Sequence, residues 1–85
     1  MRLEQLEYLI EIAKQNSMST ASEQLHLAPQ TLSISMKNLE KEMGFPIFER
    51  TSKGATMTEQ GRLVLQFALK TVTEYHNIIA QCAPQ

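Results

Sequence analysis

Residues 28–58 read APQTLSISMKNLEKEMGFPIFERTSKGATMT, and this stretch decides the fold of the 85-residue chain. In its first half, apolar side chains recur every three or four residues and, at about 100° per residue, fall in one stripe of a helix: Leu32, Met36, Leu39 and Met43. The opposite side of that helix is free to meet a surface outside the domain, and it carries Gln30, Ile34, Lys37 and Lys41. Pro29 suits the first helical position because it has no N–H to leave unsatisfied, whereas Gly44 and Pro46 favour a helix end. The pattern predicts a helix over residues 29–43.

A short β-hairpin is predicted directly after this helix, over residues 46–58. Two apolar and β-prone segments, residues 45–50 and 55–58, flank Thr51-Ser52-Lys53-Gly54. These four residues suit a turn because Gly54 can adopt a positive φ without steric cost. A helix with a polar and basic outer face, beside a hairpin with a basic tip, is what a winged helix-turn-helix DNA reader needs.

Two further helices are predicted before residue 28, which gives a mainly α fold with a three-helix core and a two-stranded wing. The inner face of the first helix carries Leu3, Leu6, Leu9, Ile10 and Ala13, and its end is expected at Asn16 and Ser17. Ser19 is expected to cap the short second helix by accepting a hydrogen bond from an amide near Ser22. Ala21 and Leu25 would face inward on that second helix.

A long C-terminal helix is predicted from Thr58, its expected N-cap, to about Cys82. Its apolar stripe comprises Val64, Ala68, Val72, Tyr75 and Ile79, with Phe67 and Ile78 alongside. A small domain covers only part of such a helix, so the remainder is solvated, packed on another domain or packed on a second copy. We favour a partner helix, and hence a homodimer through this stripe. The chain then divides into a DNA-binding domain at 1–58 and a linker or dimerisation helix with a short tail at 59–85.

The composition is that of one ordinary globular domain, with 42% hydrophobic and 20% charged residues. A net charge of −1 counts against nonspecific nucleic-acid binding. Within residues 28–58 the cations slightly outnumber the acids Glu40, Glu42 and Glu49, so the local charge weakly permits DNA binding. A single cysteine excludes an intramolecular disulfide, and neither a secretory signal nor a membrane-spanning apolar run is visible. These features predict a cytoplasmic protein.

Catalytic and metal-binding patterns are not found in the sequence. His26 and His76 lie far apart, with no cysteine or carboxylate at metal-ligand spacing around either. There is no glycine-rich phosphate loop, nucleophile elbow or CxxC motif, and the nine acids are all glutamates scattered over helix surfaces. We therefore predict a protein that is not an enzyme and uses no cofactor or metal.

The expected DNA-binding residues lie on the outer helix face and at the hairpin: Pro29, Gln30, Thr31, Ser33, Ile34, Lys37, Lys41, Arg50 and Lys53. Side chains at the start of a recognition helix enter the major groove, where Gln30 could pair with adenine. Thr31 and Ser33 could reach base edges or phosphates, or could simply cap the helix start. Ile34 could touch a thymine methyl, or be one more exposed apolar side chain.

The basic residues have a different expected role, which is contact with the phosphate backbone. Lys37 and Lys41 are placed for phosphates, unless they only solvate the helix surface. Arg50 and Lys53 would form the wing contacts to phosphate or to an adjacent minor groove. The alternative for Arg50 is an ion pair with Glu49 or another surface acid, which would contribute little stability.

From Leu3 to about Ile79 the chain resembles the N-terminal DNA-binding domain of the LysR-type transcriptional regulators. The resemblance rests on the order and spacing of many residues: Leu6, Ser17-Met18-Ser19, Ala21, Leu25-His26-Leu27, Leu32-Ser33, Leu39-Glu40, Glu42-Met43-Gly44, Phe48-Glu49-Arg50-Thr51, Gly54, Met57-Thr58-Glu59 and Gly61. It implies a winged helix-turn-helix that binds double-stranded promoter DNA, with a long linker helix that pairs in a dimer. It also implies a larger C-terminal domain that senses a small-molecule coinducer and is absent from these 85 residues, so that we expect a fragment rather than a natural short protein.

Three departures from the family pattern accompany the resemblance. Ala28-Pro29-Gln30 stands where the family often has Ser-Gln-Pro or Ser-Gln-Ser, and Ile34 stands where a basic or polar residue is common. Ser22 replaces the second residue of a common Ala-Ala pair. The fold is unaffected by these departures, but the operator sequence does not follow from the resemblance. The alternative function on the same fold is a protein-interaction or dimerisation module that does not bind DNA.

Overall fold

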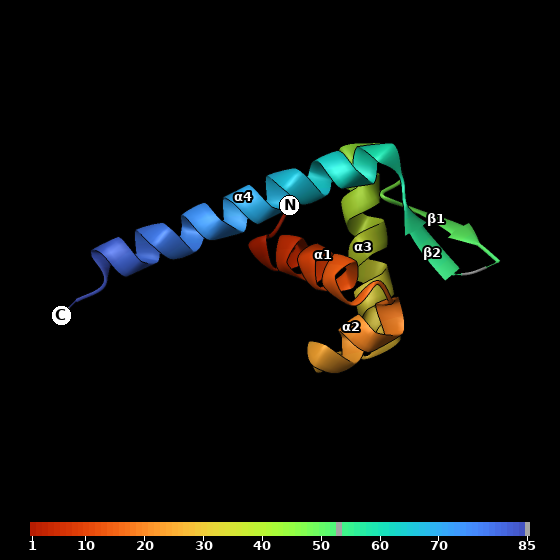
Figure 1. Cartoon of the computed structure of the whole chain (residues 1–85), viewed down its shortest axis with the longest axis horizontal. Helices are drawn as coiled ribbons and strands as arrows, with labels where there is room; N and C mark the ends of the chain where they lie inside the picture. The colour runs from red at the N-terminus through yellow and green to blue at the C-terminus, as the bar shows by residue number, and fades with distance from the viewer. Residues whose placement is uncertain (53, 85) are drawn as a thin grey trace.

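The computed structural model describes residues 1–52 and 54–84. The elements follow the chain in the order α1 (Leu3–Gln15), α2 (Met18–Gln24), α3 (Pro29–Met43), β1 (Phe48–Thr51), β2 (Gly54–Met57) and α4 (Glu59–Cys82). The first three helices pack together, and the hairpin lies beside α3 (Figure 1). The long helix α4 continues well past this cluster, so that the molecule measures 51 × 26 × 19 Å (Figure 1). The predicted winged helix-turn-helix is confirmed.

One hydrophobic core joins all four helices to the segment that leads into the hairpin. Its buried residues are Leu6, Leu9, Ile12, Ala21, Leu32, Met36, Leu39, Ile47, Val64 and Ala68. The predicted inner stripe of α3 is confirmed, with Met43 partly buried at its end. On α1 the buried face differs from the predicted one. Ile12, which was not predicted to face inward, is buried, whereas Ile10 is only partly buried.

The turn between α2 and α3 contains a non-glycine residue in the left-handed backbone conformation. His26 has a φ of 57°. The amide of Leu27 donates to the Ser22 carbonyl at 2.9 Å, which satisfies a carbonyl at the end of α2. A polar side chain such as histidine is several-fold enriched in this conformation. Four residues, 25–28, therefore suffice to turn the chain from α2 into α3.

The predicted cap of α2 was wrong by two residues. Ser17, not Ser19, is the N-cap, and its side chain accepts a hydrogen bond from the Thr20 amide at 3.1 Å. The reason is that α1 ends at Gln15 and the left-handed Asn16 turns the chain at once, so α2 already begins at Met18. The buried Ser22 hydroxyl donates to the Ser19 carbonyl at 2.7 Å. This bond satisfies a hydroxyl at a position where the family pattern has alanine.

The other predicted helix boundaries are confirmed. Pro29 is the first residue of α3, and Gly44 ends that helix with a φ of 87°. Thr58 caps α4 by accepting from the Gly61 amide at 2.9 Å. The segment that contains the wing thus begins at the left-handed Gly44 and ends at the capping residue Thr58.

The expected dimer stripe on α4 needs correction in its first half. Val64 and Ala68 are buried in the core of a single chain, 7% and 0% exposed, because this half of α4 packs on α1. A partner helix cannot reach them, and Val72 is partly buried against the same core. Tyr75 and Ile79, farther along α4, are about half exposed, at 45% and 53%. The core of the domain therefore continues past residue 58, the expected domain boundary.

Candidate nucleic-acid interface

The outer face of α3 is open along its whole length. Most of its expected DNA-binding residues are exposed, namely Pro29, Gln30, Thr31, Ile34, Lys37 and Lys41, and Ser33 is half-buried. Ile34 is 58% exposed, more than most large apolar side chains in the described part of the chain. Within residues 1–52 and 54–84, neither lysine forms an ion pair. The face therefore presents uncommitted polar, basic and apolar groups to an external partner.

No side chain caps the start of α3. Its N-cap is Ala28, which has no side-chain acceptor, and the residue has extended backbone with φ −66° and ψ 142°. The alternative role for Thr31 and Ser33, capping of the helix start, is therefore wrong. The first amides of α3 remain available, and helix N-termini favour negatively charged groups such as phosphates.

The hairpin presents its two faces to different surroundings. The strands are antiparallel, with Arg50 opposite Ala55 and Glu49 opposite Thr56. Successive side chains of a strand point to opposite faces, so Arg50 shares a face with Phe48, and Glu49 lies on the other. Gly54 has the predicted positive φ, 107°, at the turn. Lys53, the expected tip contact, lies outside the described residues.

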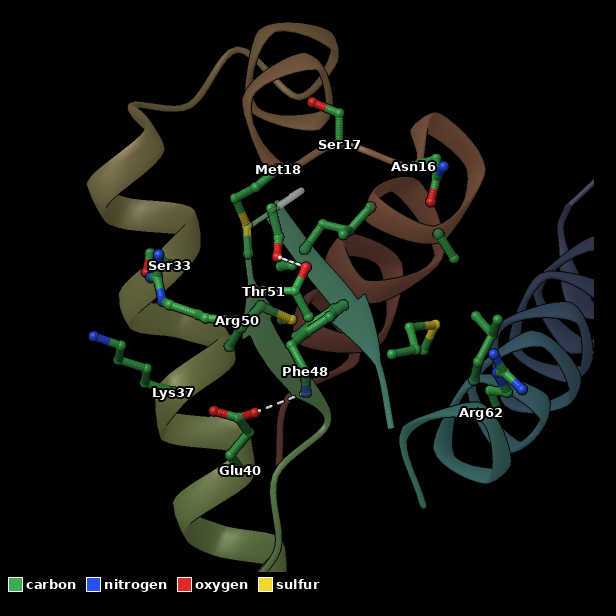
Figure 2. Close-up of a pocket in the computed structure, with 17 residues that line it drawn as sticks. Asn16, Ser17, Met18, Ser33, Lys37, Glu40, Phe48, Arg50, Thr51 and Arg62 are labelled. Atoms are coloured by element: carbon green, nitrogen blue, oxygen red, sulfur yellow. Dashed lines mark hydrogen bonds between the residues drawn. The ribbon is translucent and has the colours of Figure 1, made fainter. Parts of the chain in front are cut away.

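A cavity of about 790 Å³ lies between the Arg50 face of the hairpin and the helices, and it is lined by α1, the start of α2, α3 and the start of α4. Its basic lining residues are Lys37, Arg50 and Arg62, and Ser33 and Glu40 line it from α3 (Figure 2). Arg50 extends from β1 toward α3, on the same side as Lys37 (Figure 2). The alternative role of Arg50, a surface ion pair with Glu49 or another acid, is not found in the described structure. The cavity thus gathers positive charge from three separate elements.

Arg62 was missed by sequence reasoning. It lies in the first turns of α4 and is exposed, with its side chain at the border of the cavity (Figure 2). The available sequence signal was its position, four residues after the Thr58 cap. The first turns of α4 follow the hairpin directly, so a cation there can lie beside the wing. The periodicity of α4 indicates which residues are outside, but it does not indicate which of them adjoin the wing.

Two of the three acids that dilute the local charge have partners. Glu40 accepts hydrogen bonds from the backbone amides of Ile47, at 2.7 Å, and Phe48, at 3.1 Å; Figure 2 shows the bond to Phe48. Glu42 lies 2.7 Å from the amino group of Met1. Glu42 is therefore paired with a cation from outside residues 28–58, and the Glu40 carboxylate is held against the backbone that leads into the wing.

The base of the wing is held from both sides at Ile47, which is fully buried. Its amide is bound by Glu40 of α3, and its carbonyl accepts from the Thr58 amide at 2.9 Å. The Thr58 hydroxyl donates to the Pro46 carbonyl at 2.7 Å. Gly61 lies so close that a Cβ built on it would overlap the Ile47 carbonyl oxygen and lie 3.0 Å from the carbonyl carbon. The wing is consequently fixed to both α3 and α4.

Two other kinds of feature, a metal site and a membrane-spanning helix, were sought in the described residues. They contain no group of three His, Cys, Asp or Glu side chains that could hold a metal ion. Over the same ranges, no helix has the length and apolar character needed to cross a bilayer. His26 and His76 are both exposed, and Cys82 is an exposed free thiol. The polar and basic surface of α3 and the hairpin remains the candidate site.

Comparisons with known proteins agree with this geometry. The sequence model described as "Bacterial regulatory helix-turn-helix protein, lysR family" matches residues 3–62. A curated relative, the "Probable RuBisCO transcriptional regulator" of Gracilaria tenuistipitata var. liui, is 40% identical over 65 residues, which are 76% of this chain and 21% of that protein. The chain thus spans about a fifth of that relative.

Solved structures share the arrangement of all the elements. The crystal structure of a "BenM_DBD/catB site 1 DNA Complex" superposes with a TM-score of 0.90 at 28% identity, covering 95% of this chain and 91% of that chain. A full-length OxyR variant from Pseudomonas aeruginosa has a TM-score of 0.90 at 31% identity, covering all of this chain, 100%, and 30% of the OxyR chain.

Proposed function

The chain belongs to the lysR family of bacterial regulatory helix-turn-helix proteins, and from this premise we propose that it binds double-stranded promoter DNA as part of a transcriptional regulator. In the proposed complex, α3 lies in the major groove and the wing lies on the adjacent backbone or minor groove. The observation that carries the proposal is the open face of α3, whose polar and basic side chains have no partner in the described structure and which lies beside Arg50 of the wing. The BenM structure in complex with DNA has the same fold, which supports this orientation.

The proposed contacts divide into sequence reading and backbone positioning. Gln30 is suited to adenine and Ile34 to a thymine methyl, because amide groups and apolar side chains match these base edges. Thr31 and Ser33 supply hydroxyls to base edges or phosphates, and Pro29 allows a close approach of the helix start. The cations Lys37, Lys41, Arg50 and Lys53 neutralise phosphates and carry no sequence information.

Binding measured across a salt series tests this proposal. Fluorescence anisotropy with promoter fragments should give a log Kd that rises linearly with log salt concentration. Lys37→Ala should lower the slope by about 1 and weaken binding to all sequences similarly. Lys70→Ala, an exposed lysine on α4 far from the wing, is the matched control and should leave the slope unchanged. Binding that does not respond to salt would favour the alternative, an interaction module without DNA.

We also propose that two copies pair through the C-terminal half of α4. The support is the exposed apolar surface of Tyr75, Ile78 and Ile79, which no other element of the described chain covers. Val72 would border this surface, since it is partly buried against its own core. A two-fold dimer would place two recognition helices on one face of the DNA, as pseudo-palindromic operators require.

Two further elements of the proposal concern the longer protein. A small-molecule coinducer would act through a C-terminal domain beyond these 85 residues, because the chain spans about a fifth of the curated relative. A DNA-binding regulator acts where the chromosome is, so we propose a cytoplasmic location. Attachment of a fluorescent protein to the full-length regulator, with imaging of its overlap with the nucleoid, tests the location.

A further inference from the structure

We propose that Glu40 is a positioning residue, which sets the orientation of the wing on the recognition helix and thereby the reach of Arg50 to DNA. The consequence for DNA rests on the proposed function. The orientation itself can be measured in the free protein.

The argument begins with the position of Glu40 on α3. Ser33, Lys37 and Glu40 follow at spacings of four and three residues, so they form one row on the helix. All three line the cavity below the hairpin (Figure 2). Glu40 is therefore on the side of α3 that faces the wing, in the same row as a proposed phosphate contact.

The second step concerns what the carboxylate binds. One oxygen, Oε2, accepts from the amides of Ile47 and Phe48, which are the last residue before β1 and the first residue of β1. Hydrogen bonds to a charged acceptor are shorter and roughly twice as strong as those between neutral groups. The glutamate thus fixes the direction in which the strand leaves α3.

The third step connects this anchor to Arg50. Phe48 and Arg50 are two residues apart on a four-residue strand, so their side chains share one face. A rotation of the strand at Phe48 therefore moves the Arg50 side chain relative to Lys37. The other anchors of the wing lie at the start of α4: Thr58, its N-cap, donates to the carbonyls of Pro46 and Ile47, and Gly61 packs closely on the Ile47 carbonyl. Among the described residues, Glu40 alone makes a side-chain hydrogen bond that ties the amides of Ile47 and Phe48 to the recognition helix.

The alternative role of Glu40, a surface acid that repels DNA, predicts the opposite effect of its removal. A carboxylate near phosphates weakens binding, so its neutralisation alone would strengthen binding. Glu49→Gln is the matched control, because Glu49 is exposed on β1 and makes no side-chain hydrogen bond in the described structure. Glu49→Gln should bind slightly tighter. Glu40→Ala should bind more weakly, and Glu40→Gln should recover part of the loss because its amide oxygen still accepts.

A double-mutant cycle on DNA binding gives the decisive readout. In the wild type, Arg50→Ala should weaken binding several-fold. In the Glu40→Ala background the same change should weaken binding at least about twofold less, because directly coupled sites are non-additive. Lys37→Ala should keep its full effect in both backgrounds. An unchanged Arg50→Ala penalty, or tighter binding by Glu40→Ala, would overturn the proposal while leaving DNA binding intact.

A measurement without DNA separates failure of this proposal from failure of the proposed function. Backbone NMR of the free protein should show faster amide exchange at Ile47 and Phe48 in Glu40→Ala. Residual dipolar couplings should show β1 and β2 rotated relative to α3, with α1 and α4 unchanged. Those changes would uphold the positioning role even if the wild type did not bind promoter DNA. An unchanged hairpin orientation would refute the role whatever the DNA result.

Discussion

Replacement of Gly61 by alanine is expected to destabilise the domain, although alanine is the better helix former. In an exposed helix interior, this substitution would stabilise by about 1 kcal/mol. At Gly61 the new Cβ would overlap the Ile47 carbonyl oxygen and lie 3.0 Å from its carbonyl carbon and 3.1 Å from its Cα. All three atoms belong to the backbone of a fully buried residue, so none can move aside by a rotamer change.

The magnitude follows from these opposing effects. Overpacking a buried site costs about 1–3 kcal/mol, occasionally more, and a clash with clamped backbone belongs at the upper end. Subtraction of the helix-propensity gain leaves a net loss of about 2 kcal/mol. For a domain of this size, each kcal/mol lowers Tm by about 4–8 °C, so Gly61→Ala should melt about 8–16 °C lower than the wild type.

Thermal and urea unfolding followed by circular dichroism would measure this loss, at one fixed protein concentration because the proposed dimer would make Tm concentration-dependent. Gly44 provides the matched control, because a Cβ there meets nothing within 4 Å but the φ is 87°. Gly44→Asn should therefore be milder than Gly44→Ala, since asparagine tolerates left-handed backbone. Gly61→Asn should be no milder than Gly61→Ala. A Gly61→Ala variant that melts at or above the wild-type temperature would refute the close-approach argument.

Three other perturbations test separate features of the chain. Ser17→Ala should destabilise by about 1 kcal/mol because it removes the cap of α2, whereas Ser19→Ala should change the unfolding free energy by less than about 0.5 kcal/mol; equal effects would contradict the assignment. Replacement of Tyr75 and Ile79 together by glutamate should yield monomers that retain the wild-type circular dichroism spectrum, and dimers in sedimentation velocity would exclude this interface. Ile34→Ala should weaken binding by about 1 kcal/mol or more only at operators with an A·T pair at the contacted position, and an equal loss on every sequence would exclude a thymine contact.

Much of the fold could be predicted because it depends on local sequence patterns, namely the spacing of apolar residues and the residues at helix ends. The stripe of α3, Pro29 at its start and Gly44 at its end depend only on helical geometry and backbone preferences, and all are confirmed. The misplaced cap of α2 shows where local patterns are ambiguous. Ser17 and Ser19 are equally good caps in isolation, and the choice is made by how soon Asn16 turns the chain after α1.

The site was predictable only in part, for a physical reason. Exposure of Lys37 and Ile34 follows from the helix period, which the sequence contains. The burial of Val64 and Ala68, and the neighbourhood of Arg62, depend on where α4 packs against the rest of the chain. Glu40 was counted as a charge against DNA, whereas its carboxylate is committed to two amides eight residues or fewer away. These hydrogen bonds depend on the path of the chain after Gly44, and the helix period of the sequence does not predict that path.

The portion of α4 beyond the core has a consequence for operator spacing if two copies pair there. A helix advances about 1.5 Å and turns about 100° per residue, so seven residues shift the partner by about 10 Å and return it to nearly the same face. Ten ångströms correspond to about three base pairs at about 3.4 Å each. Insertion of seven residues between Val72 and Tyr75 would then leave each domain folded and the pairing surface intact, but change the distance between the half-sites that the dimer recognises. In this arrangement the length of α4 beyond the core sets the number of base pairs between the half-sites, and this length can change in steps of two helical turns during evolution.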